Sequence, residues 1–375
     1  MTDPLPKNIL FITALILIEE NRSSPTVNRQ LKIIEHLSRT NNLKILSLNL
    51  EPRIFQGTNF FAKIFEKVAM KIINMIGDSY FVLINKYRKA IIAELKTNKY
   101  DTVITTIYPP SFVSLIRWIK KYAKSAKIIL DMSDPVTASV FFNDYAYPKR
   151  KLFSSFETKY LKQINVLVVL NKEIKEYYEA KFPGLKVIVV EVGLDEHTIC
   201  NSFSRTKINI NGNINLLYAG IFYEKLREPF NLYSAILSGP ANVKLFIYGS
   251  CSRHYQPPKS EKLIYGGLIS KDEMKEKYGI ADIIVFIDNF YGVQVPAKTF
   301  EVFATQKPIL FIYENGKSPS LNYAKEYDGI FYAKNTVDSI KSTLLSLTKN
   351  TKYIYPRDLT KYYWANLLKE FDNII

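Results

Sequence analysis

The residues best suited to bind a charged ligand lie in one segment of the second half of the chain. It reads Gly292-Val-Gln-Val-Pro-Ala-Lys-Thr-Phe-Glu301 and continues as Val302-Phe-Ala-Thr-Gln-Lys-Pro-Ile-Leu310. We expect Pro296 or Ala297 to begin a helix, because proline is tolerated at that position. The free N–H groups and positive dipole end of such a helix would bind a diphosphate, with Thr299 in the same turn.

Lys298 and Glu301 add charge to this predicted site. A cation in the first turn opposes the helix dipole, so Lys298 is a poor choice for helix stability alone and favours a ligand. Glu301 lies one turn further on the same face, where its carboxylate could accept hydrogen bonds from ribose hydroxyls. An ordinary surface ion pair explains the same spacing.

A second candidate segment, Leu217-Tyr-Ala-Gly-Ile-Phe-Tyr-Glu-Lys-Leu-Arg227, ends a predicted strand at Gly220. A residue without Cβ lets the backbone approach a ligand closely. Lys225 and Arg227 follow in the loop, and a guanidinium group suits a diphosphate, above all one that gains charge as a leaving group. The alternative is a solvated loop that carries two cations.

A third segment, Tyr265-Gly-Gly-Leu-Ile-Ser-Lys-Asp-Glu273, ends a predicted strand in paired glycines. Ser270 and Glu273 have the spacing of a capping box at the start of a helix. A plain tight turn explains the glycines nearly as well. The backbone that precedes the helix could contact the edge of a nucleotide base through Gly267, Leu268 and Ile269.

Two carboxylates, Asp131 and Asp134, follow a predicted strand in the first half. A carboxylate beyond a strand end could take a proton from a hydroxyl group, and Asp134 is the better placed of the two. Equally, Asp131 or Ser133 could cap a turn that ends at Pro135. Three residues after the first predicted strand could line the same site: Glu19, Glu20 and Arg22.

Strands and helices that must position these segments alternate along the chain. Near-continuous apolar strands that alternate with helices indicate parallel sheets covered on both faces, that is, doubly wound α/β domains. The strands expected in the first half are Asn8–Ala14, Leu43–Leu48, Thr102–Thr106, Lys127–Leu130, Val166–Leu170 and Val187–Val190. Those expected in the second half are Ile214–Ala219, Lys244–Tyr248, Lys262–Tyr265, Ile283–Ile287, Pro308–Phe311 and Gly329–Tyr332.

Between the two sets of strands lies the polar stretch 195–213, which contains the turn signal Asn211-Gly212. We therefore predict an N-terminal Rossmann-like domain over 1–200 and a second over 213–357. In the remaining segment, 358–375, we expect a last amphipathic helix over 359–371, which could pack back on the first domain. Ligands of open α/β sheets bind beyond the carboxyl ends of the strands, so the two domains are expected to face a central cleft.

The overall composition of the chain limits the classes of function that we expect. The chain has 375 residues, 47% of them hydrophobic, with a formal net charge of +16 and two cysteines. The charge favours an anionic partner, and the absence of Cys/His spacing argues against a structural zinc site. Because the sequence holds neither a convincing secretory signal nor an apolar run of about 18 residues, we expect a cytoplasmic protein without a spanning helix.

The stretch 60–99 interrupts the alternation with a long helical pattern and no strand. It holds eight basic and three acidic residues, and an apolar stripe begins at Phe60. A basic amphipathic helix of this kind can lie on the inner face of a membrane as a peripheral contact. A helical insertion packed on its own domain, with solvated lysines, is the simpler interpretation.

The three segments of the second half, in this order and spacing, resemble the donor half of GT-B glycosyltransferases. They look like the family-4-like group that builds bacterial surface polysaccharides, and Leu170-Asn-Lys-Glu173 and Val190-Glu-Val-Gly-Leu-Asp195 resemble its approach to the linker. The resemblance implies transfer of a sugar from a nucleotide-diphosphate sugar, a UDP-sugar first, to a lipid-linked or glycan acceptor. Lys298 and Arg227 would hold the diphosphate and Glu301 the ribose.

The resemblance implies neither a metal nor another cofactor. Where retaining members often carry a second glutamate this chain has Val293, so the anomeric outcome stays open. A nucleotide-sugar epimerase or another GT-B relative would use the same donor site. A basic nucleic-acid-binding protein is the alternative of another class, but no nucleic-acid motif occurs and the charges are spread along the chain, so nucleic acid is not an expected partner.

Overall fold

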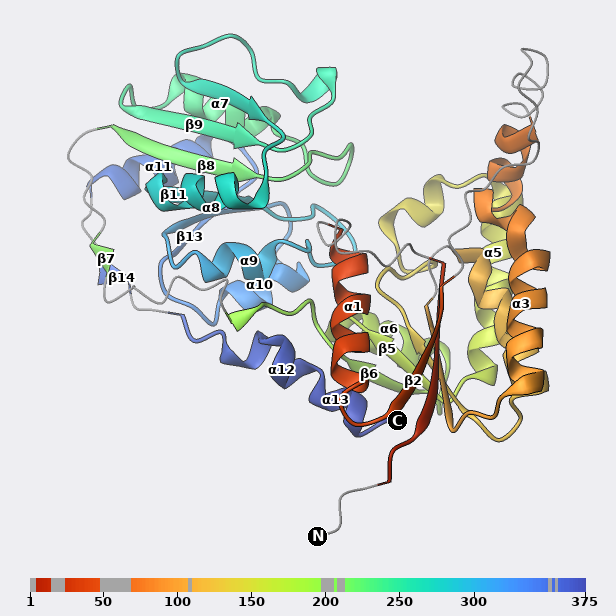
Figure 1. Ribbon diagram of the computed structural model, residues 1–375. Helices are drawn as coiled ribbons and strands as arrows, with labels where there is room; N and C mark the ends of the chain where they lie inside the picture. The colour runs from red at the N-terminus through yellow and green to blue at the C-terminus, as the bar shows by residue number, and fades with distance from the viewer. Residues whose placement is uncertain are drawn as a thin grey trace. The chain divides into compact units, whose positions relative to one another are not determined.

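The computed structural model describes residues 5–14, 24–47, 69–106, 110–196, 206–207, 213–349, 353–354 and 357–375. The chain divides into two compact units, of which the first comprises Met1–Val192 together with Ala365–Ile375 and the second Gly193–Trp364. Each unit contains one six-stranded sheet (Figure 1).

The sheet of the first unit is parallel throughout and has the strand order β2-β1-β3-β4-β5-β6. Its inner strands are almost completely buried and rich in β-branched residues, as expected of a sheet with helices on both faces. The strands are β1 (Asn8–Thr13), β2 (Asn42–Ser47), β3 (Thr102–Thr106), β4 (Lys127–Asp131), β5 (Val166–Val169) and β6 (Lys186–Val189).

Helices accompany these strands, and the longer ones bury apolar residues on one face. In α1 the buried residues Ile33, Ile34 and Leu37 recur at helical spacing. The described helices of this unit are α1 (Pro25–Leu37), η2 (Ser79–Leu83), α3 (Ile84–Thr97), η3 (Pro110–Leu115), α4 (Ile116–Tyr122), η4 (Val140–Asp144), α5 (Tyr147–Tyr160), η5 (Leu161–Gln163), α6 (Lys172–Lys181) and α13 (Lys369–Asp372), with residues 69–76 also helical.

The predicted helical stretch 60–99 is not continuous over the part that the structure describes. Residues 69–76 form a helix, Gly77 and Asp78 interrupt it, and η2 and α3 follow. Asp78 is extended and its carboxylate accepts a hydrogen bond from the N–H of Tyr80, so it caps a new helical turn. Residues 60–68 lie outside the described residues.

The second sheet has the order β10-β9-β8-β11-β12-β13 and is also parallel throughout. Helices α7 (Phe230–Ser238), α8 (Lys271–Ile280), α9 (Thr299–Ala304), α10 (Pro319–Ala324) and α11 (Val337–Lys349) accompany it, with η7 (Arg253–Tyr255) in a loop. The strands are β8 (Ile214–Ala219), β9 (Val243–Tyr248), β10 (Leu263–Gly267), β11 (Ile283–Ile287), β12 (Ile309–Tyr313) and β13 (Ile330–Lys334). A short antiparallel pair joins β7 (Thr206–Lys207) to β14 (Tyr353–Ile354).

All the expected strands are present, with ends shifted by at most two residues, so the predicted fold class of two doubly wound α/β units is confirmed. The expected helix over 359–371 is instead three short pieces, η8 (Thr360–Tyr362), α12 (Trp364–Leu367) and α13. Between them the backbone of Leu194 bonds to Tyr362 and Trp364 at 2.8 and 3.0 Å, which holds Tyr363 in an extended conformation.

Residues 365–375 complete the first unit (Figure 1). His36 of α1 lies 2.9 Å from the carboxylate of Asp372, and the ammonium group of Lys7 donates to the backbone oxygen of Ile375 at 2.6 Å. Phe371 and Ile374 are buried. The first unit therefore draws part of its core from a segment that follows the second unit in sequence.

Candidate functional site

The strand order of the second unit indicates where a ligand would bind. The chain passes from β8 to β9 on one side and from β11 to β12 on the other, while β8 and β11 are neighbours. Open α/β sheets bind ligands at such a topological switch point, beyond the carboxyl ends of the strands. The residues that follow β8 and β11 here are Gly220 and Asp288.

Glycine occupies the ends of three adjacent strands at this edge. Gly220 follows β8, Gly249 follows β9 and Gly267 ends β10, and backbone hydrogen bonds of 2.8–2.9 Å join these ends. At Gly249 φ is +131°, and a Cβ would lie 2.1 Å from the carbonyl oxygen of Gly220. Glycine is therefore required at this position, where the hydroxyl of Tyr265 donates to the carbonyl oxygen of Gly249 at 3.0 Å. Gly249 was not among the residues expected from sequence.

Arg227 lies beside this glycine edge. The backbones of Tyr223 and Arg227 exchange hydrogen bonds of 3.0 and 2.8 Å, which closes a tight turn with exposed Lys225 at φ +61°. The guanidinium carbon of Arg227 lies 5.6 Å above the ring of Tyr223. Its Nε is buried and has no hydrogen-bond partner among the described residues. A buried donor of this kind suits a ligand oxygen.

The residues directly after β11 were also missed from sequence. Asp288 is fully buried and accepts hydrogen bonds from the hydroxyl of Ser318 and, at 2.7 Å, from the N–H of Asn289. Burial raises the pKa of Asp288 to about 6, although these donors and the charge of Arg227 act to lower it. The side-chain NH₂ of Asn289 donates to Gln294, whereas its buried Oδ1 has no partner among the described residues.

One backbone hydrogen bond joins the two sides of the switch point. The N–H of Phe290, two residues beyond Asp288, donates to the carbonyl oxygen of Leu226 at 2.9 Å. The loop that carries Arg227 is thus fixed to the loop that carries Asn289. Two buried polar atoms without partners, one donor and one acceptor, therefore lie on connected loops at the same edge.

The helix expected at Pro296 or Ala297 begins later than predicted. The N–H and the hydroxyl of Thr299 both bond to the carbonyl oxygen of Pro296, at 3.0 and 2.7 Å, and this turn delays α9 until Thr299. Lys298 becomes the N-cap, and its Nζ lies 3.7 Å from Oε1 of Glu301. Both side chains are 39% exposed. The ordinary ion pair considered from sequence is therefore present, and both groups remain accessible to a ligand.

Tyrosines connect Glu301 with the arginine loop. The hydroxyl of Tyr278 lies 3.4 Å from Oε1 of Glu301, and burial, followed by this carboxylate and Tyr218, raises the pKa of Tyr278 well above its usual value. Burial also raises the pKa of Tyr218 to about 12, against the opposing charge of Arg227. Glu301, Tyr278, Tyr218 and Arg227 therefore influence one another within a single neighbourhood.

The expected base-contacting residues lie at the end of the edge strand β10. Gly267 has φ +71°, where glycine is favoured, and Leu268 is 82% exposed, with Ile269 half-buried beside it. The predicted capping box is confirmed, because the side chains of Ser270 and Glu273 each bond to the backbone of the other. An apolar side chain as exposed as Leu268 is available to a flat ligand surface.

In the first unit the two candidate carboxylates have opposite environments. Asp131 is 1% exposed and pairs with Arg29, whose Nη2 lies 2.7 Å from Oδ1. The other guanidinium nitrogen of Arg29 donates to the backbone of Val190 and Glu191 at 2.9 and 3.0 Å. Asp134 is exposed. Of the two, Asp134 is the one that a substrate could reach.

Tyr145 lies near Asp134 and belongs to a group of polar residues. Burial raises the pKa of Tyr145, and the charges of Asp78 and Asp134 raise it further. Lys149 lies 4.4 Å above the Tyr145 ring, and Asp78 accepts bonds of 2.8 Å from both the N–H and hydroxyl of Ser111. Sequence reasoning missed this group because the acid lies inside the stretch predicted to be one helix. The candidates Glu19, Glu20 and Arg22 lie outside the described residues.

The chain resembles known proteins in structure and not in sequence. The sequence matches no protein-family model and no curated protein. Sucrose-phosphate synthase from Thermosynechococcus elongatus has TM-score 0.64 and 11% identity over 99% of this chain and 98% of its own. The lipopolysaccharide outer core galactosyltransferase WaaB has TM-score 0.61 and 13% identity over 98% of both chains. S. aureus TarM, solved with UDP, has TM-score 0.54 and 13% identity over 77% of this chain and 58% of its own.

The chain has the GT-B fold. Identities of this size show similarity of fold alone, so the chemistry must be argued from the residues. Among the described residues no group of three or more His, Cys, Asp or Glu side chains could hold a metal ion. None of the described helices is long and apolar enough to cross a membrane.

Proposed function

We propose that the protein is a glycosyltransferase of the family-4-like kind, which moves a sugar from a nucleoside-diphosphate sugar to a membrane-associated acceptor. The donor would bind the second unit, at the carboxyl ends of β8 and β11. A UDP-sugar is the expected donor, and the acceptor would be lipid-linked or a growing polysaccharide. The solved proteins of similar fold include a galactosyltransferase and a protein crystallised with UDP.

The observation that carries the proposal is the pair of buried, partnerless atoms at the switch point. Arg227 Nε and Asn289 Oδ1 have been taken out of water without a hydrogen bond in exchange. Leaving such groups unsatisfied costs about 1–3 kcal/mol each, which a bound ligand would recover. A donor and an acceptor beside a backbone edge of glycines suit a diphosphate oxygen and a sugar or ribose hydroxyl.

Lys298, Arg227 and Glu301 would then bind different parts of the donor. The two cations would hold the diphosphate and stabilise the charge that develops when the sugar leaves, so no metal is needed in the proposal. Glu301 would accept hydrogen bonds from the ribose, breaking its 3.7 Å contact with Lys298. Gly220 and Lys225 would border the diphosphate, and the backbone of residues 267–269 the base.

On the acceptor side, Asp134 would accept the proton of the attacking hydroxyl as general base. Asp131 keeps a supporting role, because its carboxylate is committed to Arg29. Lys149 lies near Asp78 and Tyr145 and adds a positive charge to this group. Hydrogen-bond donors and acceptors are therefore both available to a glycan.

Two surface features of the first unit support an acceptor at a membrane. On the helix 69–76, Ile72 and Met75 are each 51% exposed. On α4, Trp118 is surrounded by cations, with Arg88 at 5.2 Å and Arg117 at 4.6 Å from its ring. Exposed apolar side chains and an aromatic ring flanked by cations each suit the interface of an anionic bilayer.

Donor binding is tested by thermal unfolding with UDP, GDP, CDP, dTDP or AMP. A ligand at 100 times its Kd stabilises the folded state by about 2.7 kcal/mol, so one nucleoside diphosphate should raise Tm selectively. Arg227→Met and Lys298→Ala should lose the shift, while Lys259→Ala, in the exposed loop before β10, should keep it. Equal shifts in all variants, or none with any nucleotide, would overturn the donor site. Transfer of label to a lipid extract rather than a soluble glycan would then identify the acceptor class.

A further inference from the structure

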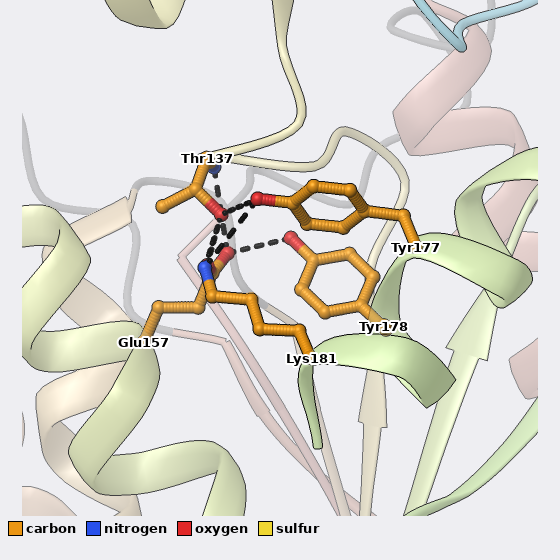
Figure 2. Close-up of polar contacts among 5 residues, drawn as sticks. All are labelled: Thr137, Glu157, Tyr177, Tyr178 and Lys181. Carbon is orange, nitrogen blue, oxygen red and sulfur yellow. Dashed lines mark hydrogen bonds and ion pairs between the residues drawn. The ribbon is translucent and has the colours of Figure 1, made fainter. Parts of the chain in front are cut away.

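A buried carboxylate in the first unit bonds to three neighbours at once. Glu157 of α5 is 1% exposed and accepts hydrogen bonds from the Tyr178 hydroxyl at 2.5 Å, from the Lys181 ammonium at 2.7 Å and from the Thr137 hydroxyl (Figure 2). Tyr177 approaches the same hydroxyl of Thr137 to 3.0 Å. The groups come from α5, from α6 and from the segment between β4 and α5.

Two of these three elements need no extra fixing. Helices α5 and α6 are already anchored to the first unit by buried side chains, among them Phe153 and Ile174. The segment 132–146 has no long helix or strand of its own and contains only η4. What the cluster adds is therefore the attachment of Thr137, whose N–H also lies 3.4 Å from Glu157 Oε1. Burial and the adjacent carboxylate raise the pKa of Tyr178 well above its usual value, so this donor keeps its proton.

The same segment is fixed at its other end by a second buried carboxylate. Asp131, at the end of β4, pairs with Arg29. Between Asp131 and Thr137 the chain buries Met132, Pro135 and Val136 and exposes Asp134. Residues 131–137 thus begin at one buried ion-paired carboxylate, Asp131, and end at Thr137, which is bonded to another, Glu157. The exposed carboxylate of Asp134 lies between them.

We infer that the Glu157–Lys181 pair, acting through Thr137, is a positioning device for Asp134. The inference rests on the proposed function, in which Asp134 takes the acceptor proton. Proline after Asp134 restricts the backbone of that residue, so a fixed Thr137 also limits where the carboxylate can move. A misplacement of 1 Å at a reacting group can cost about 100-fold in rate, which gives such a device its value. Glu157 itself is too buried to touch substrate.

Thr137→Val tests the inference, because valine keeps the shape of threonine and removes only its hydroxyl bonds. With the donor that the thermal screen identifies, kcat should fall by about ten-fold or more. The donor Kd should not change, since donor binding belongs to the second unit. Thr137→Ser restores the hydroxyl and should restore most of kcat. Tyr177→Phe, a milder change at the same hydroxyl, should lower kcat less.

Hydrogen–deuterium exchange separates positioning from plain stability. Residues 132–139 should lose protection in Thr137→Val and regain it in Thr137→Ser. Thr158→Val, an exposed threonine next to Glu157, is the matched control and should change neither exchange nor kcat. Lost protection with normal kcat would show a merely structural cluster and overturn the inference.

Asp134→Asn distinguishes failure of this inference from failure of the proposed function. If Asp134→Asn abolishes turnover and Thr137→Val equals the wild type, the positioning role is wrong and the base assignment stands. If Asp134→Asn retains full turnover, the base assignment is wrong and the positioning role falls with it. A parallel loss in both variants, with donor Kd unchanged, is the expected result.

Discussion

The carboxyl edges of the two sheets use buried polar groups in opposite ways. At the first edge, Asp131 is satisfied by Arg29 and, close by, Glu157 by Lys181, so both buried carboxylates have partners within the protein. At the second edge, Arg227 and Asn289 each keep a buried atom without a partner. The first edge uses paired carboxylates to hold a segment, although Oγ1 of Thr106, at the end of β3, is also buried without a partner among the described residues. The second edge has a donor and an acceptor without partners on connected loops, which suits a ligand.

The hydrogen bonding of a buried polar side chain therefore indicates whether the side chain serves the fold or a ligand. A buried charge is costly unless it is paired, so a fully paired one has its explanation inside the fold. A buried polar atom without a partner has no such explanation, and where a donor and an acceptor of this kind lie together at a switch point we assign them to a ligand. The contrast can be tested through stability at the first edge and through pH and backbone shape at the second.

The largest expected effect is on the stability of the first edge. Arg29→Met leaves Asp131 buried without its partner, which should lower the free energy of unfolding by about 3–5 kcal/mol. Urea denaturation would measure the loss. Arg39→Met, at an exposed position just after α1, is the control and should change stability little. Adding Asp131→Leu to Arg29→Met should recover part of the loss, and a loss of less than about 1 kcal/mol would break the comparison.

The second effect is a pH dependence at the second edge. The pKa of Asp288 is raised to about 6 in the folded protein, against 3.8 as its ordinary value. The carboxyl group therefore favours folding below about pH 4, and that contribution is lost as pH rises through 6. At 1.36 kcal/mol per pKa unit the loss amounts to about 3 kcal/mol.

Asp288→Asn removes this titration, so its stability relative to the wild type should rise between pH 4 and pH 7. Urea denaturation of both proteins across this range would measure the difference. Asp272→Asn, at an exposed position in the first turn of α8, is a suitable control. A difference between Asp288→Asn and the wild type that is independent of pH would contradict the burial of a titrating acid.

The smallest effect concerns the glycine edge. Gly249→Ala places a Cβ 2.1 Å from the Gly220 oxygen at φ +131°, which should cost about 1–3 kcal/mol of stability and weaken donor binding. In Gly279→Ala the new Cβ meets nothing within 4 Å inside α8, so this control should gain about 0.5–1 kcal/mol. Calorimetry with the preferred nucleotide would measure both. If the two variants have the same stability and the same affinity for the nucleotide, the glycine edge does not belong to the site.

The fold could be predicted from the sequence because buried parallel strands are continuous runs of apolar residues. Ile283–Ile287 is an example, and it is buried at every position. Helix continuity was less predictable. The helical pattern over 359–371 held no sign that Leu194, far away in sequence, would hold Tyr363 extended. At Gly77 and Asp78 the break was visible as a glycine followed by a capping residue.

The candidate site was predictable where the signal was local. Gly220 and Gly267 lie at strand ends as expected. The choice between Asp131 and Asp134 was not available, because it depends on Arg29, which lies 102 residues from Asp131. Asn289 is the second residue after an apolar strand and could have been suspected from position alone, but its partnerless Oδ1 is a property of packing. The assigned roles of the site residues remain predictions.

Because residues 365–375 belong to the first unit, the order of synthesis on the ribosome affects how that unit folds. The second unit, 193–364, is synthesised in full before the segment that supplies Phe371 and Ile374 to the core of the first. At about 5–20 residues per second that interval lasts roughly 10–30 s. During this time the nascent first unit lacks its final buried layer next to α1. Until residues 365–375 have been synthesised, the apolar surface that they cover stays exposed, and a nascent chain in that state is prone to aggregation.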